Sequence, residues 1–236
     1  MLTLVLTRHG LTDRSRPEQH LGQKIDISIN EAGRRQAEAL RRRLAPVGFD
    51  RVVTSPLFRA RETAAILAGR MPVEADPRLA EMDYGAWEGR TYADIDAADR
   101  AFRGEWLEHP DTLACPDGES GDDVAVRVMS FLQDLLDDHR RWVARASLRA
   151  ATSTGGSSRA AGTDHRVLAV AHGTLNRVFL CVALDTDLRR FRQRFIQSQC
   201  NLTVLAWADD AGPRQGTLLA SNDTSHLQGV SDLPWG

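Results

Sequence analysis

Two histidine-containing segments carry the residue types in this chain that are best suited to chemistry. Thr7-Arg8-His9-Gly10 follows the apolar run Leu2–Leu6, and His172-Gly173 follows the apolar run Val167–Ala171. Apolar runs of this length are typical of buried strands in a parallel sheet. A side chain just past such a strand lies at the carboxyl edge of the sheet, where open α/β folds bind ligands. Two imidazoles and an arginine at that edge indicate chemistry on an anion, and on phosphate in particular.

Two arginines at the start of a predicted helix support that interpretation. Arg59 and Arg61 follow Ser55-Pro56, and proline is tolerated in the first turn of a helix. Surface arginines normally avoid the positive end of a helix dipole, so arginines at this place indicate a bound anion. The alternative is a solvated network of ion pairs with neighbouring acids, which is common and contributes little to stability.

An acidic segment supplies a candidate proton donor. Leu79–Gly89 contains three carboxylates in a stretch that predicts a loop. In most proteins these would be ordinary loop acids. Beside side chains that hold a phosphate, however, one of them is placed to act as a general acid.

The elements that must position these residues alternate between strand and helix. Strands are predicted at Leu2–Leu6, Arg51–Thr54, Val73–Ala75, Val167–Ala171 and Leu202–Trp207. Helices are predicted from the capping residue Asn30 to Gly48, from Ser55 to about Gly69, over an amphipathic stretch around residues 124–142, and from Thr174. This order predicts an α/β fold, a three-layer α/β/α sandwich with a mostly parallel central sheet.

Two segments interrupt the alternation. Around residues 85–120 the pattern weakens into loops and short helices with several aromatic side chains, which we interpret as a lid-like insertion over one edge of the sheet. Residues 146–164 are small, polar and rich in glycine, and they predict a flexible loop within one α/β unit. We therefore expect a single domain over residues 1–236.

Composition narrows the classes of partner. The net charge is −2, so no global basic field favours nucleic acid or an anionic membrane. The three cysteines are too few and too scattered for a disulfide framework or a Cys-x-x-Cys metal site. The first apolar run is too short for a signal peptide or a membrane span. We expect a cytoplasmic protein with no metal, no cofactor and no nucleic-acid or membrane partner. The sequence leaves the oligomeric state open, with a homodimer among the options.

Together these segments resemble the histidine phosphatase superfamily, also called the phosphoglycerate mutase-like family. Four segments carry the resemblance in chain order: Arg8-His9-Gly10, Ser55–Ala64, Glu81 within Leu79–Gly89, and His172-Gly173. The segments Asp117–Ser120 and Ser221–Leu227 are also similar to family segments. Each motif is weak alone, but four in this order are specific, and they span nearly the whole chain apart from the 146–164 loop.

The resemblance implies a role for each matching position. His9 would be the nucleophile that attacks phosphorus and becomes a phosphohistidine. Arg8, Arg59 and His172 would bind the three equatorial oxygens without a metal. Glu81 would protonate the leaving alkoxide and then activate the water that cleaves the intermediate. Weaker substrate contacts are implied at Thr12, Arg61 and Gly173.

This chain also departs from the family pattern near its first motif. Family members often carry an acidic residue directly after Arg-His-Gly and an asparagine a few positions later. Those places hold Leu11 and Ser15 here, and Leu21 stands where many relatives have glutamine before Gly22. The phosphate pocket should survive these changes, whereas substrate contacts on that side cannot be transferred.

The sequence favours a phosphatase over three alternatives. Trp87-Glu88-Gly89-Arg90-Thr91 resembles the phosphatase branch, so we expect hydrolysis of a small phosphorylated metabolite. The first alternative is phosphoryl transfer of the cofactor-dependent mutase type, and the second is a non-catalytic protein that binds a phosphorylated ligand. The third, a metal site built on His9, His172 and Glu81, is poorer because the neighbouring arginines would repel a divalent cation.

Overall fold

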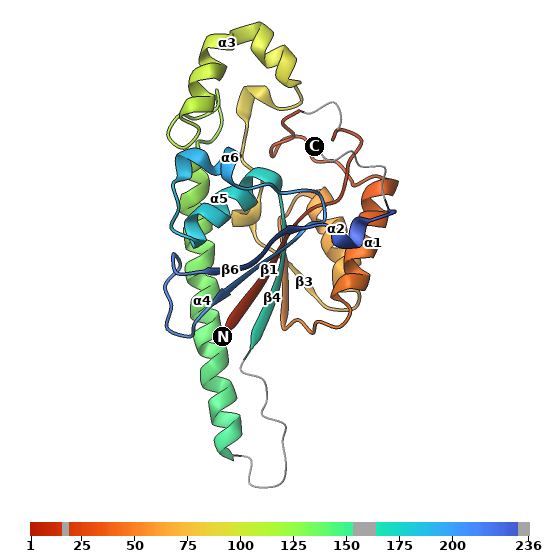
Figure 1. Cartoon of the computed structure of the whole chain (residues 1–236), viewed down its shortest axis with the longest axis vertical. Coiled ribbons are helices and arrows are strands. Elements are labelled where there is room, and N and C mark those ends of the chain that lie inside the picture. The colour runs from red at the N-terminus through yellow and green to blue at the C-terminus, as the bar shows by residue number, and fades with distance from the viewer. Residues whose placement is uncertain (16–18, 153–163, 231–236) are drawn as a thin grey trace.

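A six-stranded mixed sheet forms the centre of the computed structural model, which describes residues 1–15, 19–152 and 164–230 (Figure 1). Its strands are β1 Leu2–Arg8, β2 Arg51–Thr54, β3 Val73–Ala75, β4 His165–Ala171, β5 Leu202–Trp207 and β6 Thr217–Asp223. The strand order is β3-β2-β4-β1-β5-β6. The pairs β1–β4, β2–β4 and β2–β3 are parallel, whereas β1–β5 and β5–β6 are antiparallel. The predicted mostly parallel sheet is confirmed.

Helices cover both faces of this sheet, so the predicted three layers are also confirmed (Figure 1). They are α1 Glu31–Leu44, α2 Phe58–Ala68, α3 Tyr92–Glu108, α4 Gly121–Thr152, α5 Gly173–Ala183 and α6 Phe191–Arg194. α1 and α2 lie on one face, and α4 and α5 lie on the other. As predicted, Asn30 caps α1, because its side chain accepts from the Gly33 N–H.

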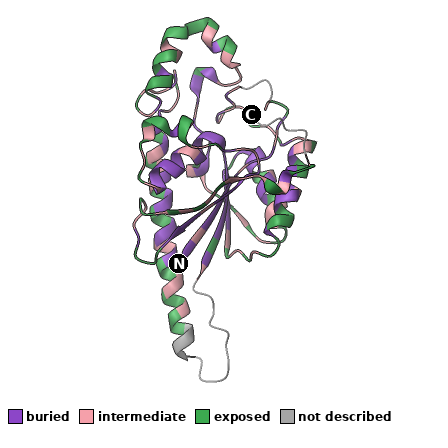
Figure 2. Ribbon diagram, viewed as in Figure 1, coloured by how far each residue is buried: buried purple, intermediate pink, exposed green. Residues whose placement is uncertain are grey.

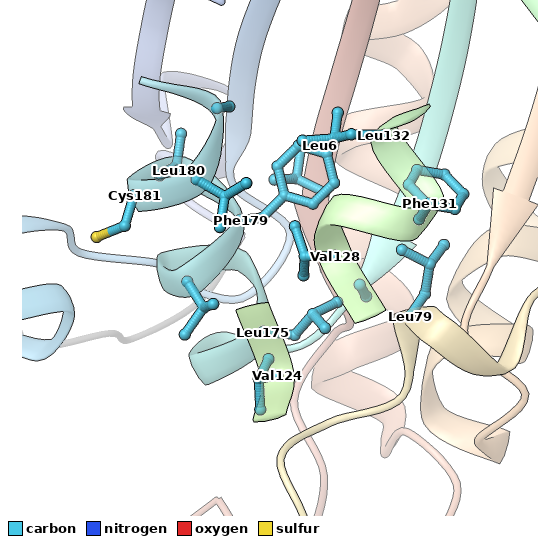
Figure 3. Close-up of a cluster of buried hydrophobic side chains, with 14 of the residues drawn as sticks. Leu6, Leu79, Val124, Val128, Phe131, Leu132, Leu175, Phe179, Leu180 and Cys181 are labelled. Carbon is cyan, nitrogen blue, oxygen red and sulfur yellow. The ribbon is translucent and has the colours of Figure 1, made fainter. Parts of the chain in front are cut away.

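Successive side chains of the central strands pack on opposite faces of the sheet. Leu4 and Leu6 of β1 belong to the cluster beneath α4 and α5, together with Phe131 and Phe179 (Figure 3). Val5 belongs to the cluster beneath α1 and α2. Because both faces are covered, the central strands are buried along most of their length (Figure 2). This burial explains why β1 and β4 are nearly continuous apolar runs in the sequence.

The largest departure from the sequence expectation is the length of α4. The loop predicted from residue 146 begins inside this helix, which continues to Thr152. Alanine, leucine and arginine make up most of residues 146–152, and these are strong helix formers that allow the helix to extend. The remainder of the predicted loop, residues 153–163, lies outside the described residues. β4 then begins at His165, two residues earlier than expected.

Smaller differences occur at other element ends. α1 ends at Leu44, before Gly48, and α2 begins only at Phe58, so Ser55-Pro56 precedes the helix. The strand β6 was not predicted at all. It pairs with β5 at the sheet edge and alternates between exposed and partly buried residues, so its apolar signal is weak.

The region around residues 85–120 is more helical than expected. α3 runs for 17 residues and starts with a capping box between Thr91 and Asp94. A kink at Asp99 divides α3 into two shorter helices, in agreement with the short helices predicted for this region. No helix in the described part of the chain is both long enough and apolar enough to cross a bilayer.

Candidate active site

β1 places His9 at the carboxyl edge of the sheet. The His9 N–H donates to the carbonyl oxygen of Ala171 at 3.0 Å, which continues the pairing with β4 one residue beyond Arg8. The ring is buried, and its Nδ1 lies 2.8 Å from the carbonyl oxygen of Gly10. Because a carbonyl oxygen only accepts, Nδ1 carries the proton in this bond. The lone pair of the neutral ring therefore lies on Nε2.

The surroundings of His9 keep the ring neutral. Burial is the largest cause of its lowered pKa, and the positive charges of Arg59 and then Arg8 lower the pKa further. The hydrogen bond to Gly10 acts in the opposite direction and does not outweigh them. At neutral pH the ring is thus a neutral imidazole with an unprotonated Nε2, which is the form required of a nucleophile.

His172 lies next to His9 because β4 is the neighbour of β1. The two ring centroids are 5.2 Å apart, and His172 is fully buried at the start of α5. Its Nε2 lies 2.7 Å from the Ser55 hydroxyl oxygen, which also accepts the Leu57 N–H. The Ser55 hydroxyl can donate its proton to Nε2, and in that tautomer the proton of His172 lies on Nδ1. That buried Nδ1 has no protein partner within the described ranges, so it can donate to a bound anion.

Two arginines beside the histidines are held by neutral acceptors. Arg59 is 1% exposed, and its Nη1 and Nη2 donate to the carbonyl oxygens of Ile25 and Gly22 at 3.0 and 2.7 Å. Arg8 donates through Nη1 to the carbonyl oxygen of Gln197 at 3.0 Å. In both side chains Nε is buried with no acceptor among the residues that the structure describes. Carbonyl oxygens orient the guanidinium groups without neutralising them, so both remain available to an anion.

The glycine after each histidine serves close packing. A Cβ on Gly173 would lie 3.3 Å from the guanidinium carbon of Arg8, so a side chain there would press on this arginine. A Cβ on Gly10 would lie only 2.6 Å from the Gly33 carbonyl oxygen in α1. Glycine at position 10 is therefore required by the close approach of the α1 backbone.

Glu81 is fixed at the amino terminus of α5. Its Oε1 accepts from the N–H groups of Leu175 at 2.9 Å and Met82 at 3.0 Å, and its Oε2 accepts from the Thr174 N–H at 3.2 Å. The N–H groups at a helix amino terminus often bind a ligand anion. Here two of them hold the Glu81 carboxylate, which the helix dipole favours at this end.

These side chains line a cavity of about 280 Å³ at the carboxyl edge of β1 and β4. Arg8, His9, Arg59, Glu81 and Gly173 lie on its wall, and the ring of His172 lies beside that of His9. The structure thus brings together six of the eight residues singled out in the sequence.

Thr12 and Arg61 are not among the lining residues. Thr12 is buried and forms a local turn, in which its backbone and side chain contact Ser15. Arg61 is exposed on α2, and its guanidinium lies 5.7 Å from the ring centre of Phe58. Residues two apart on a helix point in nearly opposite directions, so burial of Arg59 at the cavity turns Arg61 away.

Sequence reasoning missed several lining residues, among them Gln19, His20, Tyr92, Arg177 and Arg192. Arg177 had a usable signal, because it follows Gly173 by four positions on the predicted helix and shares its face. Arg192 had none, since it lies on the four-residue helix α6, which sequence patterns do not predict.

No group of three or more His, Cys, Asp or Glu side chains in the described ranges is arranged to hold a metal ion. The proposed grouping of His9, His172 and Glu81 is surrounded by arginine charge. The cavity therefore suits an anion with several oxygens better than a cation.

A family comparison agrees with this geometry. The model of the histidine phosphatase superfamily (branch 1) matches residues 4–147 and 143–223. The chain belongs to this superfamily. A glucosyl-3-phosphoglycerate phosphatase from Mycolicibacterium vanbaalenii is 35% identical over 175 residues, which cover 73% of this chain and 69% of the relative.

Two further relatives cover nearly the whole length of this chain. Phosphoserine phosphatase 1 from Hydrogenobacter thermophilus is 26% identical over 96% of this chain and 95% of the relative. A mycobacterial glucosyl-3-phosphoglycerate phosphatase, solved in complex with inorganic phosphate, superposes with a TM-score of 0.75 at 30% identity. That alignment covers 95% of this chain and 98% of the solved one. The chain is thus a member of this superfamily, and these relatives are phosphatases.

Proposed function

We propose that this histidine phosphatase hydrolyses the phosphomonoester of a small metabolite through a phosphohistidine at His9, without a metal. One observation carries the proposal: the Nδ1 proton of His9 is committed to the Gly10 carbonyl, so the unprotonated Nε2 is available in a cavity lined by arginine. The proximity of Arg8, Arg59 and His172 supports it, because three donors match the three equatorial oxygens of a phosphoryl group.

The first step transfers the phosphoryl group to the protein. The Nε2 lone pair of His9 attacks phosphorus and forms the N–P bond while the P–O bond to the leaving group breaks. Glu81, entering as the carboxylic acid, gives its proton to the leaving oxygen, and the product alcohol departs. Arg8 and Arg59 stabilise the charge on the equatorial oxygens throughout.

The second step returns the protein to its starting form. The Glu81 carboxylate, left without its proton, removes a proton from a water molecule. The water oxygen forms a bond to phosphorus as the N–P bond to His9 breaks, which releases inorganic phosphate and restores the Nε2 lone pair. Glu81 is again a carboxylic acid, so protons balance over one turnover.

The region around residues 85–120 forms part of the same proposal, as a lid within one domain that spans the chain. Tyr92, at the start of α3, lines the cavity. Trp106, near the end of α3, packs edge to face against Tyr84, which also lines the cavity. These contacts support the proposal that the segment covers the side of the site that receives the leaving group.

The test is release of phosphate from p-nitrophenyl phosphate in excess EDTA, with the wild type beside His9→Ala. Hydrolysis by the wild type that disappears in His9→Ala supports the proposal. Loss of wild-type activity in EDTA, restored by a divalent cation, contradicts the metal-free mechanism. If neither protein hydrolyses the ester, transfer between phosphoglycerates with 2,3-bisphosphoglycerate identifies a mutase. A phosphorylated ligand that binds without turnover identifies a non-catalytic protein.

A further inference from the structure

The candidate active site carries more positive charge than a phosphoryl group requires. Glu81 is the one carboxylate among the residues that line the cavity. Five arginines also line it: Arg8, Arg14, Arg59, Arg177 and Arg192. Of these five arginines, only Arg59 has a carboxylate of the described residues within 4.0 Å, which is that of Asp26. A phosphomonoester dianion held by Arg8 and Arg59 leaves the remaining arginines without an anionic partner.

Arg177 is presented to the cavity by α5. It lies one helical turn after Gly173, and its Nε donates to the Phe195 carbonyl oxygen at 3.0 Å. Its two terminal nitrogens have no acceptor among the described residues, although the side chain is mostly withdrawn from solvent. Burial lowers the pKa of Arg177, and the nearby charges of Arg192 and Arg8 lower it further. The three guanidinium groups are thus close enough to repel one another.

Arg192 is held over an aromatic ring and not by an acid. Its guanidinium carbon lies 5.0 Å from the ring centre of Trp106, which is fully buried. Trp106 also makes edge-to-face contacts with Tyr84, Trp87 and His20, so the support is rigid. A cation–π contact orients the guanidinium plane and leaves its N–H groups free for a ligand.

His20 completes this side of the cavity as a neutral group. Its ring stacks on Tyr84 with centroids 3.9 Å apart, and its Nε2 is buried with no protein partner in the described ranges. Burial, then the charges of Arg192 and Arg103, lower the pKa of His20 to about 3. His20 therefore adds a hydrogen-bonding atom but no charge to the leaving-group side.

We propose that Arg177 and Arg192 bind a second anionic oxygen group, carried by the leaving group of the substrate. The inference rests on the proposed phosphatase function and deepens it. The substrate class is then a phosphomonoester of an acid, with either a carboxylate or a second phosphate on the alcohol portion. Paired guanidinium groups suit both, because each presents two parallel N–H donors to two oxygens.

The test compares three esters built on one three-carbon skeleton: glycerol 3-phosphate, 3-phosphoglycerate and 2,3-bisphosphoglycerate. We expect kcat/KM for at least one of the two acidic esters to exceed that for glycerol 3-phosphate by about tenfold or more, since hydrogen bonds to charged groups have this size. A preference for 3-phosphoglycerate assigns a carboxylate, and a preference confined to 2,3-bisphosphoglycerate assigns a second phosphate.

Variants connect the preference to the two arginines. In Arg192→Met we expect the ratio of kcat/KM between the preferred acidic ester and glycerol 3-phosphate to fall to within about threefold of one. Arg177→Met should do the same, with its thermal midpoint measured because it also loses the Phe195 contact. Arg194→Met is the matched control, since this exposed arginine lies two residues away on α6 and should keep the wild-type ratio.

The outcomes distinguish a failure of this inference from a failure of the proposed phosphatase function. Failure of the wild type to hydrolyse p-nitrophenyl phosphate overturns the proposed function. Hydrolysis of p-nitrophenyl phosphate with no discrimination among the three esters overturns this inference alone. An acidic preference that survives in both Arg192→Met and Arg177→Met also overturns it, because other groups would then hold the second anion.

Discussion

Two of the cavities in this molecule are lined with arginine, but they differ in what partners the arginines. The cavity at the carboxyl edge of β1 and β4 has a volume of about 280 Å³ and contains five arginines beside one carboxylate. The cavity at the amino ends of β2 and β4 is larger, about 800 Å³. Its arginines and acids are equal in number: Arg51, Arg78, Arg141 and Arg145 beside Asp50, Glu74, Asp134 and Asp138.

The groups that contact the arginines decide which cavity can bind an anion. In the charge-balanced cavity at the amino ends, Arg78 lies 2.6 Å from Asp134, and Arg51 lies 2.8 Å from Glu74. In the cavity at the carboxyl edge, Arg59 donates to two carbonyl oxygens. Its one ion pair within the described ranges is with Asp26, at 4.0 Å. Acids neutralise a guanidinium, whereas carbonyl oxygens only orient it. The smaller cavity is therefore the better anion site, and neither size nor arginine content identifies it alone.

The largest effect is expected from His9→Ala. Removal of the nucleophile should lower kcat by about 10⁴-fold or more, as for other catalytic units that lose their nucleophile. Phosphate release from p-nitrophenyl phosphate measures this, and circular dichroism checks folding. The control, Arg145→Ala, changes the charge-balanced cavity and should retain activity within about twofold. Comparable losses in the two variants would remove the distinction between the cavities.

The next effect comes from Arg59→Met. Loss of a preorganised donor to the transition state should lower kcat/KM by about 10² to 10³-fold. Arg78→Met is the matched substitution in the charge-balanced cavity, where the guanidinium already has acid partners, and it should retain kcat/KM. Steady-state kinetics on p-nitrophenyl phosphate compares the two. Equal losses of kcat/KM in Arg59→Met and Arg78→Met would show that holding Arg59 by carbonyl oxygens does not make its charge more available to substrate.

Glu81→Gln should act selectively. Without a proton donor, hydrolysis of an alkyl phosphate should slow by about 10²-fold or more, because the alkoxide is a poor leaving group. An activated aryl phosphate needs little protonation, so p-nitrophenyl phosphate should be spared in its first step. Single-turnover rates of the first step on the two substrates give the comparison, because loss of the base in the second step slows both substrates alike. First-step losses of the same size on both would take Glu81 out of the acid role.

The pH dependence provides a smaller and more specific effect. Protonation of His9 abolishes its nucleophilicity, and the lowered pKa of His9 places the acid limb of kcat/KM below the ordinary histidine value of about 6.5. The Arg59 charge is the second cause of that lowering, so Arg59→Met should move the acid limb to higher pH. A pH profile of residual activity measures the shift. An acid limb that moves to lower pH in Arg59→Met would contradict this electrostatic account.

The smallest effect is expected on stability in the charge-balanced cavity. Arg78→Met breaks contacts with Asp76 at 2.7 Å and Asp134 at 2.6 Å, both partly solvated. The free energy of unfolding should fall by about 1 kcal/mol, the size typical of such pairs. Urea unfolding measures the change, and high salt should reduce it. A loss several times larger would mean that these pairs act as buried ones.

Some features of the site follow from local sequence alone. The apolar runs before His9 and His172 determine that each histidine comes at the end of a buried strand, because a strand covered on both faces is mostly apolar. Asn30 marks the start of α1 because its side chain satisfies a free helix N–H. The family motifs then indicate a phosphohistidine mechanism and its residues.

Other features depend on contacts between segments far apart in the chain. The 5.2 Å between the rings of His9 and His172 exists only because β1 and β4 are neighbours in the sheet. Local periodicity does not specify strand order, so this distance was not predictable. The same reason applies to Arg192, which reaches the site on a short helix and is oriented by Trp106.

By itself, the sequence indicated most of the residues that we propose for phosphate binding, and the strand ends at which His9 and His172 stand. Backbone periodicity and capping are local, and they act within a few residues. Only the tertiary structure decided which arginines keep a free charge. Arg61 and Arg59 are two positions apart on one helix, yet one faces solvent and the other the cavity. That choice depends on the carbonyl oxygens, acids and rings that distant segments bring to each guanidinium, and on burial that excludes water from competing with them.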